Sequence, residues 1–570
     1  MTSKRAGILF VQLPQLDNSV EGPHENVRLA AVYLRHAVEV SRQTRRYDFD
    51  VLPPQADDWD DAHVVDEIVR LSPSVIACTL YLWNVERSLD VLKRVKARLP
   101  EIRAIVGGPE ADRHHPFLLR SGVVDAAAMG EGEAVIVPLL QALRTGAPPD
   151  LQDVGWKEKS GWTWGRQPNP HTPLESILPR ASHPLLQPDA NGMAYLETSR
   201  GCPLRCVYCL YHHYHRGLGV ITPRDLTARL TVLRGRGARE IRFVDPTFNA
   251  HPAFDDILAA LVRANSSRSL AFFGEIRADT LTRAQADLLA KANVRDVEVG
   301  IQSVSPSVLN AIRRPTDLAA ASRGIRWLIK RGIRVTVDVM YGLPGQTLQD
   351  VKRSIQWTQG LGRVNLQCLQ TLLLPGTNLR RNRARWKISA ADRPPYGVTS
   401  TGTLSADELK EAEQYIQSIS PAALDSPASR FVGCSLPDLF VERVRVRVPD
   451  DLQSQEIPGA LSRRAALLYG ADLFRHRVSL AQWIRRAVQQ EPHILWQFVL
   501  LPEHEEPLDL FDFLIAEVRR LPLHVSDRYA GVWFRGKRAA RRIFVQLKKG
   551  RRYDPSWIDA VEEDLREAFH

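Results

Sequence analysis

The chain has 570 residues, of which 44% are hydrophobic and 25% charged, and its formal net charge is +11. It contains no long uncharged apolar run, so the composition excludes integral membrane and disordered proteins and indicates a soluble globular one. The length suits about three or four domains.

The first 15 residues carry positive charges followed by a short apolar run that ends before Pro14, with no small-residue cleavage site. This predicts a first β-strand rather than a signal peptide. We therefore expect a cytoplasmic protein in a reducing compartment, where a disulfide framework does not form. Clustered thiols among its six cysteines are then expected to bind metal or do chemistry.

In residues 1–147, five apolar segments alternate with amphipathic helices, which predicts a flavodoxin-like, doubly wound Rossmann sheet. The expected strands are residues 7–13, 47–52, 74–82, 102–108 and 124–130, and the expected helices include residues 26–40 and 86–99.

Glycines mark the ligand-binding edge expected for this sheet. Gly107 and Gly108 stand in VGGPE, and Gly130, Glu131 and Gly132 stand in GEGE about twenty residues later. A double glycine alone indicates only a turn. Together, the two motifs resemble the cobalamin-binding domain that precedes many radical S-adenosylmethionine (SAM) barrels, and the resemblance implies cobalamin contacts from these five residues.

The loop after the first strand is where cobalamin mutases carry the histidine that binds cobalt from below. Where cobalamin mutases carry D-x-H-x-x-G, this chain has Asp17, Ser19 and Gly22, so the resemblance implies no imidazole ligand at Ser19. His24 is either a spare ligand or an ordinary loop residue. Trp83, after the third strand, either packs in the protein or faces the corrin.

Residues 148–192 are rich in Pro, Gly and Trp and are expected to form a linker with a small hairpin. The predicted division is therefore a cobalamin-binding domain in residues 1–147, this linker, a barrel in residues 193–393, and a carboxyl-terminal region in residues 394–570.

Cys202, Cys206 and Cys209 form the pattern C-x3-C-x2-C. Three soft thiolates suit an iron–sulfur cluster with one iron open to an outside ligand. A zinc site is the alternative, and its fourth ligand would come from the histidines just downstream, His212, His213 and His215. If a cluster forms, these histidines are free to lie on the surface or to contact the substrate.

Strands and helices alternate after the cysteines, which predicts βαβ units with ligands at the carboxyl ends of a parallel sheet. The expected strands lie at residues 240–245, 270–278, 296–303, 334–345 and 365–377. Tyr208 before the third cysteine, together with FVDPTFN, EVGIQS and DVMYGLPGQT in this order, resembles a radical SAM domain. The resemblance implies a partial (β/α)6 barrel and a catalytic [4Fe–4S] cluster on the three cysteines. It further implies that the cluster chelates SAM and, once reduced, cleaves it to a 5′-deoxyadenosyl radical.

Polar residues near the ends of these strands are candidate ligands of SAM. Glu275 and Arg277 would share the inner face of a strand, where burial without a use costs several kcal/mol. Glu298 and Gln302 also share a face. Asp245 has an alternative role in capping its turn, and Gly342 serves a tight turn. The resemblance implies SAM contacts from this set: Tyr208, Asp245, Glu275, Arg277, Glu298, Gln302 and Gly342.

The carboxyl-terminal region is expected to be mostly helical α+β structure, with helices at residues 405–419 and 508–521, and to cap the substrate pocket. Its basic segment at residues 533–554 is either a solvated face or a site for nucleic acid, a phosphorylated substrate or an acidic leader peptide.

The remaining cysteines, Cys78, Cys368 and Cys434, are too few for a second cluster, and Cys78 is expected to pack in the core. The resemblance therefore predicts a cobalamin-dependent radical SAM methyltransferase of secondary metabolism. It would move a methyl group from SAM through methylcobalamin to a poorly activated carbon of a small molecule or peptide. An external electron donor of the flavodoxin or ferredoxin type is expected, and neither a membrane nor a nucleic acid is.

Three alternatives stay open at this point. The same cofactors serve radical rearrangement or cyclisation without methylation, and non-radical methyl transfer to an aromatic carbon. The more distant alternative is a cobalamin or metal sensor whose basic carboxyl-terminal region binds nucleic acid.

Overall fold

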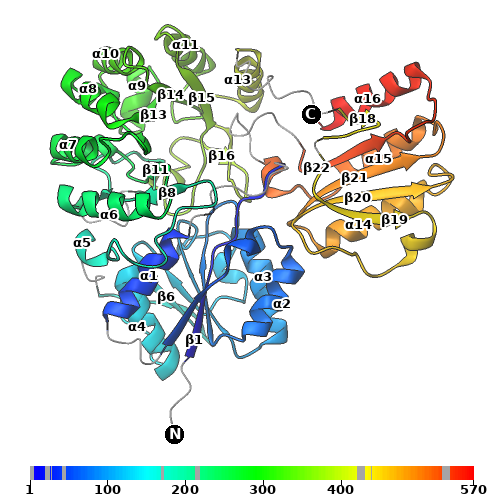
Figure 1. Cartoon of the computed structure of the whole chain (residues 1–570), viewed down its shortest axis with the longest axis horizontal. Helices are drawn as coiled ribbons and strands as arrows, with labels where there is room; N and C mark the ends of the chain where they lie inside the picture. The colour runs from blue at the N-terminus through cyan, green and yellow to red at the C-terminus, as the bar shows by residue number, and fades with distance from the viewer. Residues whose placement is uncertain are drawn as a thin grey trace.

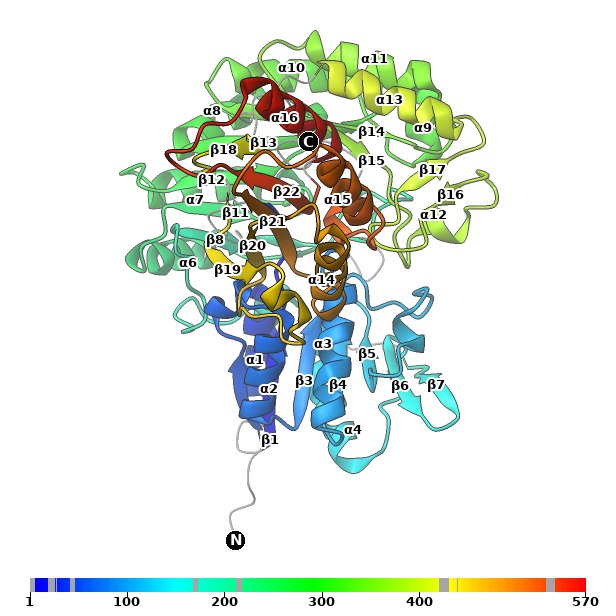
Figure 2. The same cartoon turned by 90° about the vertical axis from the view of Figure 1, so that its right-hand side faces the viewer.

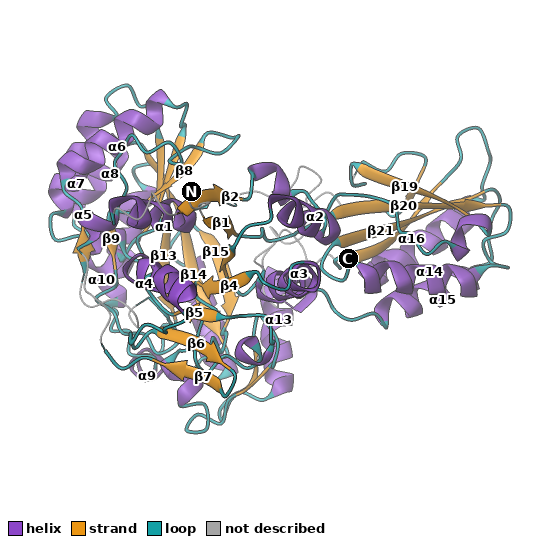
Figure 3. Ribbon diagram, turned by 90° about the horizontal axis from the view of Figure 1, so that it is seen from below, coloured by secondary structure: helices purple, strands orange, loops and turns teal. Residues whose placement is uncertain are grey.

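The structure is a computed structural model that describes residues 6–18, 26, 28–41, 47–167, 173–211, 218–419, 430–437, 439–528 and 539–569. Three units built on parallel strands follow one another along the chain (Figure 1). The first two lie against each other, and the third lies to one side of them, as the view from below also shows (Figure 3).

The first unit is a doubly wound sheet, as predicted. Its parallel strands take the order β2-β1-β3-β4-β5, and α1 packs beside α4 while α2 packs beside α3. Two separate apolar clusters, one with α1 and α4 and the other with α2 and α3, make up its core. The elements are β1 (Ala6–Val11), α1 (Leu29–Val40), β2 (Tyr47–Val51), α2 (Asp61–Leu71), β3 (Val75–Thr79), α3 (Val85–Arg98), β4 (Arg103–Gly107), β5 (Ala126–Ala128) and α4 (Gly132–Thr145).

A hairpin from the expected linker extends this sheet. Strands β6 (Val154–Glu158) and β7 (Gly161–Trp164) are antiparallel, and β6 pairs with β5. Part of residues 148–192 therefore completes the first unit, at the edge that is visible in Figure 2.

The second unit has six parallel strands in sequential order, β8-β11-β12-β13-β14-β15, with helices between them. This is the partial (β/α)6 barrel that was predicted. Its strands are β8 (Met193–Leu196), β11 (Glu240–Phe243), β12 (Ala271–Glu275), β13 (Val294–Gln302), β14 (Arg334–Tyr341) and β15 (Asn365–Gln370). Its helices are α6 (Pro223–Gly235), α7 (Phe254–Ala264), α8 (Arg283–Ala292), α9 (Pro306–Ala311), α10 (Leu318–Ile329) and α11 (Leu348–Gln359).

The chain after β15 stays on the barrel before it leaves for the third unit. Helix α13 (Ala406–Ile419) packs against α11, and its buried residues join the apolar cluster of β14.

The third unit contains both helices and strands, as expected, and its strands form one parallel sheet in the order β18-β22-β21-β20-β19. The expected helix at residues 508–521 is present as α15. The elements are β18 (Val432–Gly433), β19 (Glu442–Arg447), β20 (Arg463–Gly470), α14 (Arg477–Gln490), β21 (Leu495–Pro502), α15 (Asp509–Arg519), β22 (Arg541–Gln546) and α16 (Pro555–Phe569).

Candidate functional site

The cysteine loop follows β8 and is held by the next strand of the barrel. Buried Asp245, after β11, accepts hydrogen bonds from the Thr198 N–H (3.0 Å), the Thr198 hydroxyl (2.6 Å) and the Ser199 hydroxyl (2.6 Å). The Val207 N–H donates to the Ile312 carbonyl at 3.1 Å. These hydrogen bonds hold the cysteine loop at Thr198 and Ser199 before Cys202 and at Val207 after Cys206. Asp245 therefore positions the loop through its hydrogen bonds to Thr198 and Ser199.

The three thiols lie near polar groups of the barrel. Cys202 Sγ is 3.7 Å from the Thr247 hydroxyl, and Arg314 Nη1 is 3.7 Å from Cys206 Sγ. Burial raises the pKa of the Cys209 thiol to about 12, and the neighbouring cysteines add to this rise. A cation beside the thiols favours their charged form, which is the form that binds iron.

Arg314 also faces a group of carboxyls on three adjacent strands. Glu275 of β12 is paired in register with Glu298 of β13, and Asp338 of β14 is buried. Burial raises the pKa of Asp338 well above its usual range, and the surrounding protein also raises the pKa of Glu275, although that residue is exposed; Glu298 adds to both shifts. Asp338 Oδ1 has no hydrogen-bond partner among the described residues. These polar groups fit a polar ligand at the mouth of the barrel.

The other predicted SAM ligands lie in different surroundings. Arg277 pairs with Asp279 and donates to the Pro315 carbonyl. Gln302 is buried at a φ of +67°, and its Oε1 has no partner among the described residues. Gly342, at a φ of +82°, lies in a buried turn, and Tyr208 packs on the apolar cluster of β14.

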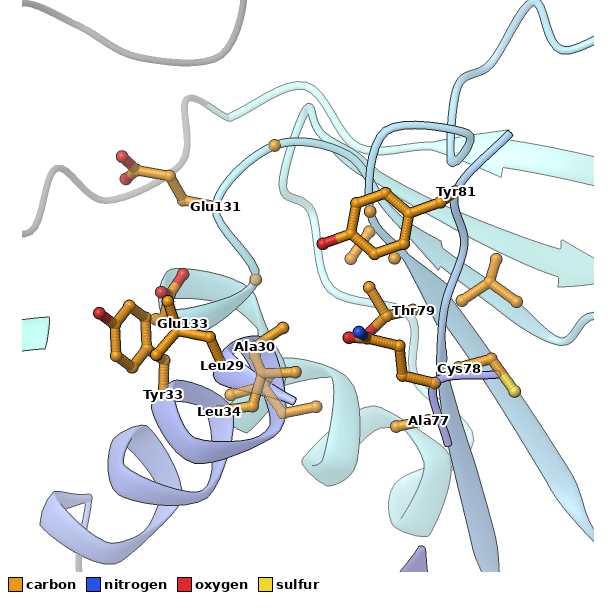
Figure 4. A pocket seen from close by; sticks show the side chains of 18 of the residues that line it. Leu29, Ala30, Tyr33, Leu34, Ala77, Cys78, Thr79, Tyr81, Glu131 and Glu133 are labelled. Carbon is orange, nitrogen blue, oxygen red and sulfur yellow. The ribbon is translucent and has the colours of Figure 1, made fainter. Parts of the chain in front are cut away.

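A cavity of about 580 Å³ lies at the carboxyl ends of β3, β4 and β5, where the cobalamin site was predicted. Gly107, Gly108, Gly130, Glu131 and Gly132 all line it, and so does Trp83. Figure 4 shows part of its wall, where Tyr81 and Glu131 project from loops and Tyr33 and Glu133 from helices. Trp83 stacks on Tyr81, with ring centroids 4.5 Å apart and planes 3° apart.

The glycines allow the chain to bend closely around this cavity. Gly108 has a φ of +92°, and a Cβ there would lie 2.7 Å from the Leu80 carbonyl oxygen. A Cβ on Gly132 would lie 2.9 Å from Leu34 Cδ2. Small residues at strand ends and an aromatic pair on one wall suit a large flat ligand with a long tail. The residues present therefore fit cobalamin.

The same cavity is lined by barrel residues beside the cysteine loop, including Tyr195, Glu197 and Arg200. Arg200 donates to both oxygens of Glu197 at 2.8 Å and to Glu133 of α4 at 3.0 Å. Its guanidinium lies 5.6 Å from the centre of the Tyr33 ring. Only Gly201 separates Arg200 from Cys202, so this ion pair links the cluster loop to the first unit.

Several residues of this site were not predicted from the sequence: Tyr33, Tyr81, Glu133, Glu197, Arg200, Arg314 and Asp338. Arg200 adjoins the cysteine motif and Asp338 lies in DVMYGLPG, so both stood within recognised segments. Arg314 had no such signal, because it reaches Cys206 from 108 positions away.

Some predictions lie outside the described residues. These are the loop positions Ser19, Gly22 and His24 and the histidines of the zinc alternative, His212, His213 and His215. In the described part of the chain, no three His, Cys, Asp or Glu side chains converge on one metal ion. A [4Fe–4S] cluster differs, since each thiolate binds a different iron. None of the described helices combines the length and apolar character needed to cross a membrane.

Two family models match the chain. The B12 binding domain matches residues 28–140, and the radical SAM superfamily matches residues 196–358. The first match covers most of the doubly wound sheet, and the second covers most of the barrel. The third unit lies beyond both.

Among known proteins, the chain is 24% identical over 347 residues to the uncharacterized methyltransferase PH0819 of Pyrococcus horikoshii, covering 58% of this chain and 74% of that one. It is 31% identical over 198 residues to the cobalamin-dependent radical SAM methyltransferase TokK of Streptomyces tokunonensis, covering 32% of this chain but only 28% of TokK.

The fold is similar to that of the radical SAM methyltransferase TsrM from Kitasatospora setae, solved with a tryptophan substrate and a SAM analogue. The TM-score is 0.53 at 18% identity, covering 66% of this chain and 75% of TsrM.

Proposed function

The chain belongs to the cobalamin-dependent radical SAM enzymes, and from that membership we propose that it moves a methyl group from SAM, by way of cobalamin, to a carbon atom of a small molecule. The observation that carries this proposal is the shared cavity, because the glycines of the first unit and Arg200 of the cysteine loop line the same space. When bound, the cluster and SAM supply a radical, and cobalamin supplies the methyl group.

The residues of the barrel have separate tasks in this proposal. Cys202, Cys206 and Cys209 hold the cluster, and Arg314 offsets the charge of the thiolates from 3.7 Å. Asp245 keeps the loop in place through Thr198 and Ser199 without touching a ligand. The groups that would contact SAM are Tyr208, Glu275, Glu298, Gln302 and Gly342, with Arg277 positioned through its pair with Asp279.

The first unit would hold the corrin and its tail against the barrel. Gly107, Gly108, Gly130 and Gly132 let the backbone approach the ligand, and Glu131 and Trp83 offer a polar and an aromatic contact. Enclosing both cofactors in one cavity aligns them and excludes water from the reacting atoms. Ser19, which the resemblance aligns with the histidine of D-x-H-x-x-G, lies outside the described residues and supplies no imidazole.

The substrate is proposed to be a small molecule or peptide of secondary metabolism. TsrM binds tryptophan, which makes a compound of similar size the first class to screen. The cluster needs one electron for each cleavage of SAM, and the chain's three further cysteines do not suffice for a second cluster. We therefore propose an external donor of the flavodoxin or ferredoxin type.

The test is anaerobic reconstitution with iron, sulfide, hydroxocobalamin and reductant, incubation with SAM and candidate substrates of tryptophan's size, and then mass spectrometry. We expect four irons per chain, retained corrin, S-adenosylhomocysteine and 5′-deoxyadenosine, and a substrate product that is 14 mass units heavier, one CH2 added. Cys206→Ala is expected to abolish 5′-deoxyadenosine, whereas Cys368→Ala, which changes a buried cysteine outside the triad, is expected to retain it.

The other outcomes are equally informative. A product of unchanged mass would favour rearrangement, and methylation without 5′-deoxyadenosine would favour non-radical transfer. A chain that retains neither iron nor corrin would contradict the proposal.

A further inference from the structure

The third unit is built separately from the cofactor cavity. It lies beyond both matched family segments and has its own large apolar core, and none of its described residues lines the cavity between the first unit and the barrel. A complete α/β fold with its own core suggests a task of its own.

The orientation of its sheet determines which end is free. At the amino end of β20, Arg463 pairs with Asp58 at 2.8 Å, and Arg464 pairs with Asp60, both of the first unit. Since all five strands are parallel, their carboxyl ends face away from this contact. In open α/β sheets, ligands bind outside the carboxyl ends of the strands.

A cavity of about 330 Å³ lies at this free end, lined by residues of neighbouring strands and the loops that follow them. This volume suits a small ligand. Three leucines, Leu467, Leu501 and Leu547, make part of the cavity lining apolar. Six lining residues have polar or charged side chains: Arg445, Tyr469, Glu503, Gln546, Lys548 and Lys549.

The charges around this cavity are unbalanced. Three cations, Arg445, Lys548 and Lys549, face one carboxylate, Glu503, which leaves a net charge of +2. Lys548 Nζ lies 4.0 Å from Glu503, a long contact, and Arg551 from outside the lining lies 3.9 Å from the same carboxylate. Glu503 is thus shared by two cations and leaves most of the positive charge of the cavity uncompensated.

We propose that this cavity binds a small molecule that carries a phosphate group. A phosphate dianion matches the net charge of +2, and arginine, lysine, amide and hydroxyl groups are its usual donors. The three leucines and the Tyr469 ring would contact the organic part of the ligand. This site is separate from the cofactor cavity, and it does not depend on the proposed methyl transfer.

The test is a calorimetric titration of inorganic pyrophosphate into the full-length protein at low ionic strength, with citrate in a parallel titration. We expect pyrophosphate to bind more tightly than citrate. Arg445→Ala and Lys549→Ala should each weaken pyrophosphate binding at least tenfold, and Glu503→Gln should tighten it several-fold because a repelling charge is removed.

Arg443→Ala is the matched control, because Arg443 is exposed on the same face of β19 but does not line the cavity. Its affinity for pyrophosphate should equal that of the unchanged protein. Equal weakening by Arg443→Ala and Arg445→Ala would show diffuse surface charge and overturn the proposal. Undetectable pyrophosphate binding, or tighter binding of citrate, would overturn it as well. Circular dichroism of each variant confirms that the fold is retained.

Discussion

At the scale of single residues, buried Asp245 holds the strand end that leads into the cysteine loop. All three of its hydrogen-bond donors belong to the strand end that leads into Cys202. In Asp245→Ala the buried Thr198 N–H and the two hydroxyls lose their acceptor. We expect the free energy of unfolding to fall by about 3 kcal/mol. Iron retention after reconstitution should fall with it.

Asp245→Asn is the matched control, since its carbonyl still accepts one of these hydrogen bonds. We expect a loss of about 1 kcal/mol and most of the iron retained. Urea denaturation and iron analysis measure both effects. Equal stability of the alanine variant and the unchanged protein would contradict this role.

Glu275 is expected to make stability depend on pH. The surrounding protein and Glu298 raise the pKa of its carboxyl above 4.5, although the residue is exposed, so the folded state favours the neutral form. The unfavourable effect of Glu275 on the free energy of unfolding is absent below pH 4.5, grows as the pH rises above that value, and is complete above the raised pKa of the folded state. Glu275→Gln should therefore raise the Tm of the cofactor-free protein more at pH 8.5 than at pH 5.

Glu67→Gln serves as the control for this measurement. Arg70 lowers the pKa of the Glu67 carboxyl, so this group is ionised throughout the interval from pH 5 to pH 8.5. The Tm difference between Glu67→Gln and the unchanged protein should stay constant over the same interval. An equally flat profile for Glu275→Gln would refute the predicted role of Glu275.

The site residues that could be predicted from the sequence belong to local motifs, whereas those that could not be predicted reach the site through contacts between distant segments. Cys202, Cys206 and Cys209 lie within eight positions, so their spacing alone was informative. Arg314 meets Cys206 only because the segment after α9 returns to the cysteine loop. Contacts of this kind come from tertiary packing, and no local pattern encodes them.

At the scale of elements, the hairpin strand β9 (Ser199–Arg200) and helix α4 are joined by the Arg200–Glu133 pair. The side chains are 12% and 9% exposed, so water screens this interaction only weakly. A double-mutant cycle with Arg200→Gln and Glu133→Gln should give a coupling energy of about 2 kcal/mol, measured by urea denaturation.

The exposed pair Arg334–Asp296 is the comparison, with side chains 70% and 36% exposed. Its cycle should give about 0.5 kcal/mol. Similar coupling energies for the two pairs would mean that Arg200 does not hold the units together.

Hydrophobic periodicity predicted the helices and strands of the first two units, but only some of those in the third unit. Apart from Arg463, Arg464 and Gln497, strands β20 and β21 are apolar runs buried on both faces, and periodicity cannot distinguish such runs from buried helices. Helix α15 was predicted because its apolar residues recur at helical spacing. Strands that are buried on both faces are typical of parallel sheets, which is the topology of the third unit. Because such strands lack an alternating pattern, β20 and β21 were not predicted from the sequence.

At the scale of the whole molecule, Arg464 anchors the third unit to the first. Its side chain is 1% exposed, pairs with Asp60 and Glu442, and lies 5.4 Å from the Trp496 ring. Arg464→Met keeps the length of the side chain and removes its charge, so Asp60 is left buried without its cation. We expect the free energy of unfolding to fall by about 4 kcal/mol.

The double variant Asp60→Asn, Arg464→Met should recover part of this loss, because Asp60 no longer leaves a buried charge without a partner. Arg447→Ala is the surface control, since the Arg447 side chain is 65% exposed and pairs with the exposed Asp450 at 3.3 Å. Its effect should stay within about 0.5 kcal/mol. Hydrogen exchange should rise in Arg464→Met at the bridge between Trp59 and Leu461, while the amides of β13 stay protected. Equal stability of Arg464→Met and Arg447→Ala would mean that the two units are held together by their apolar contacts instead.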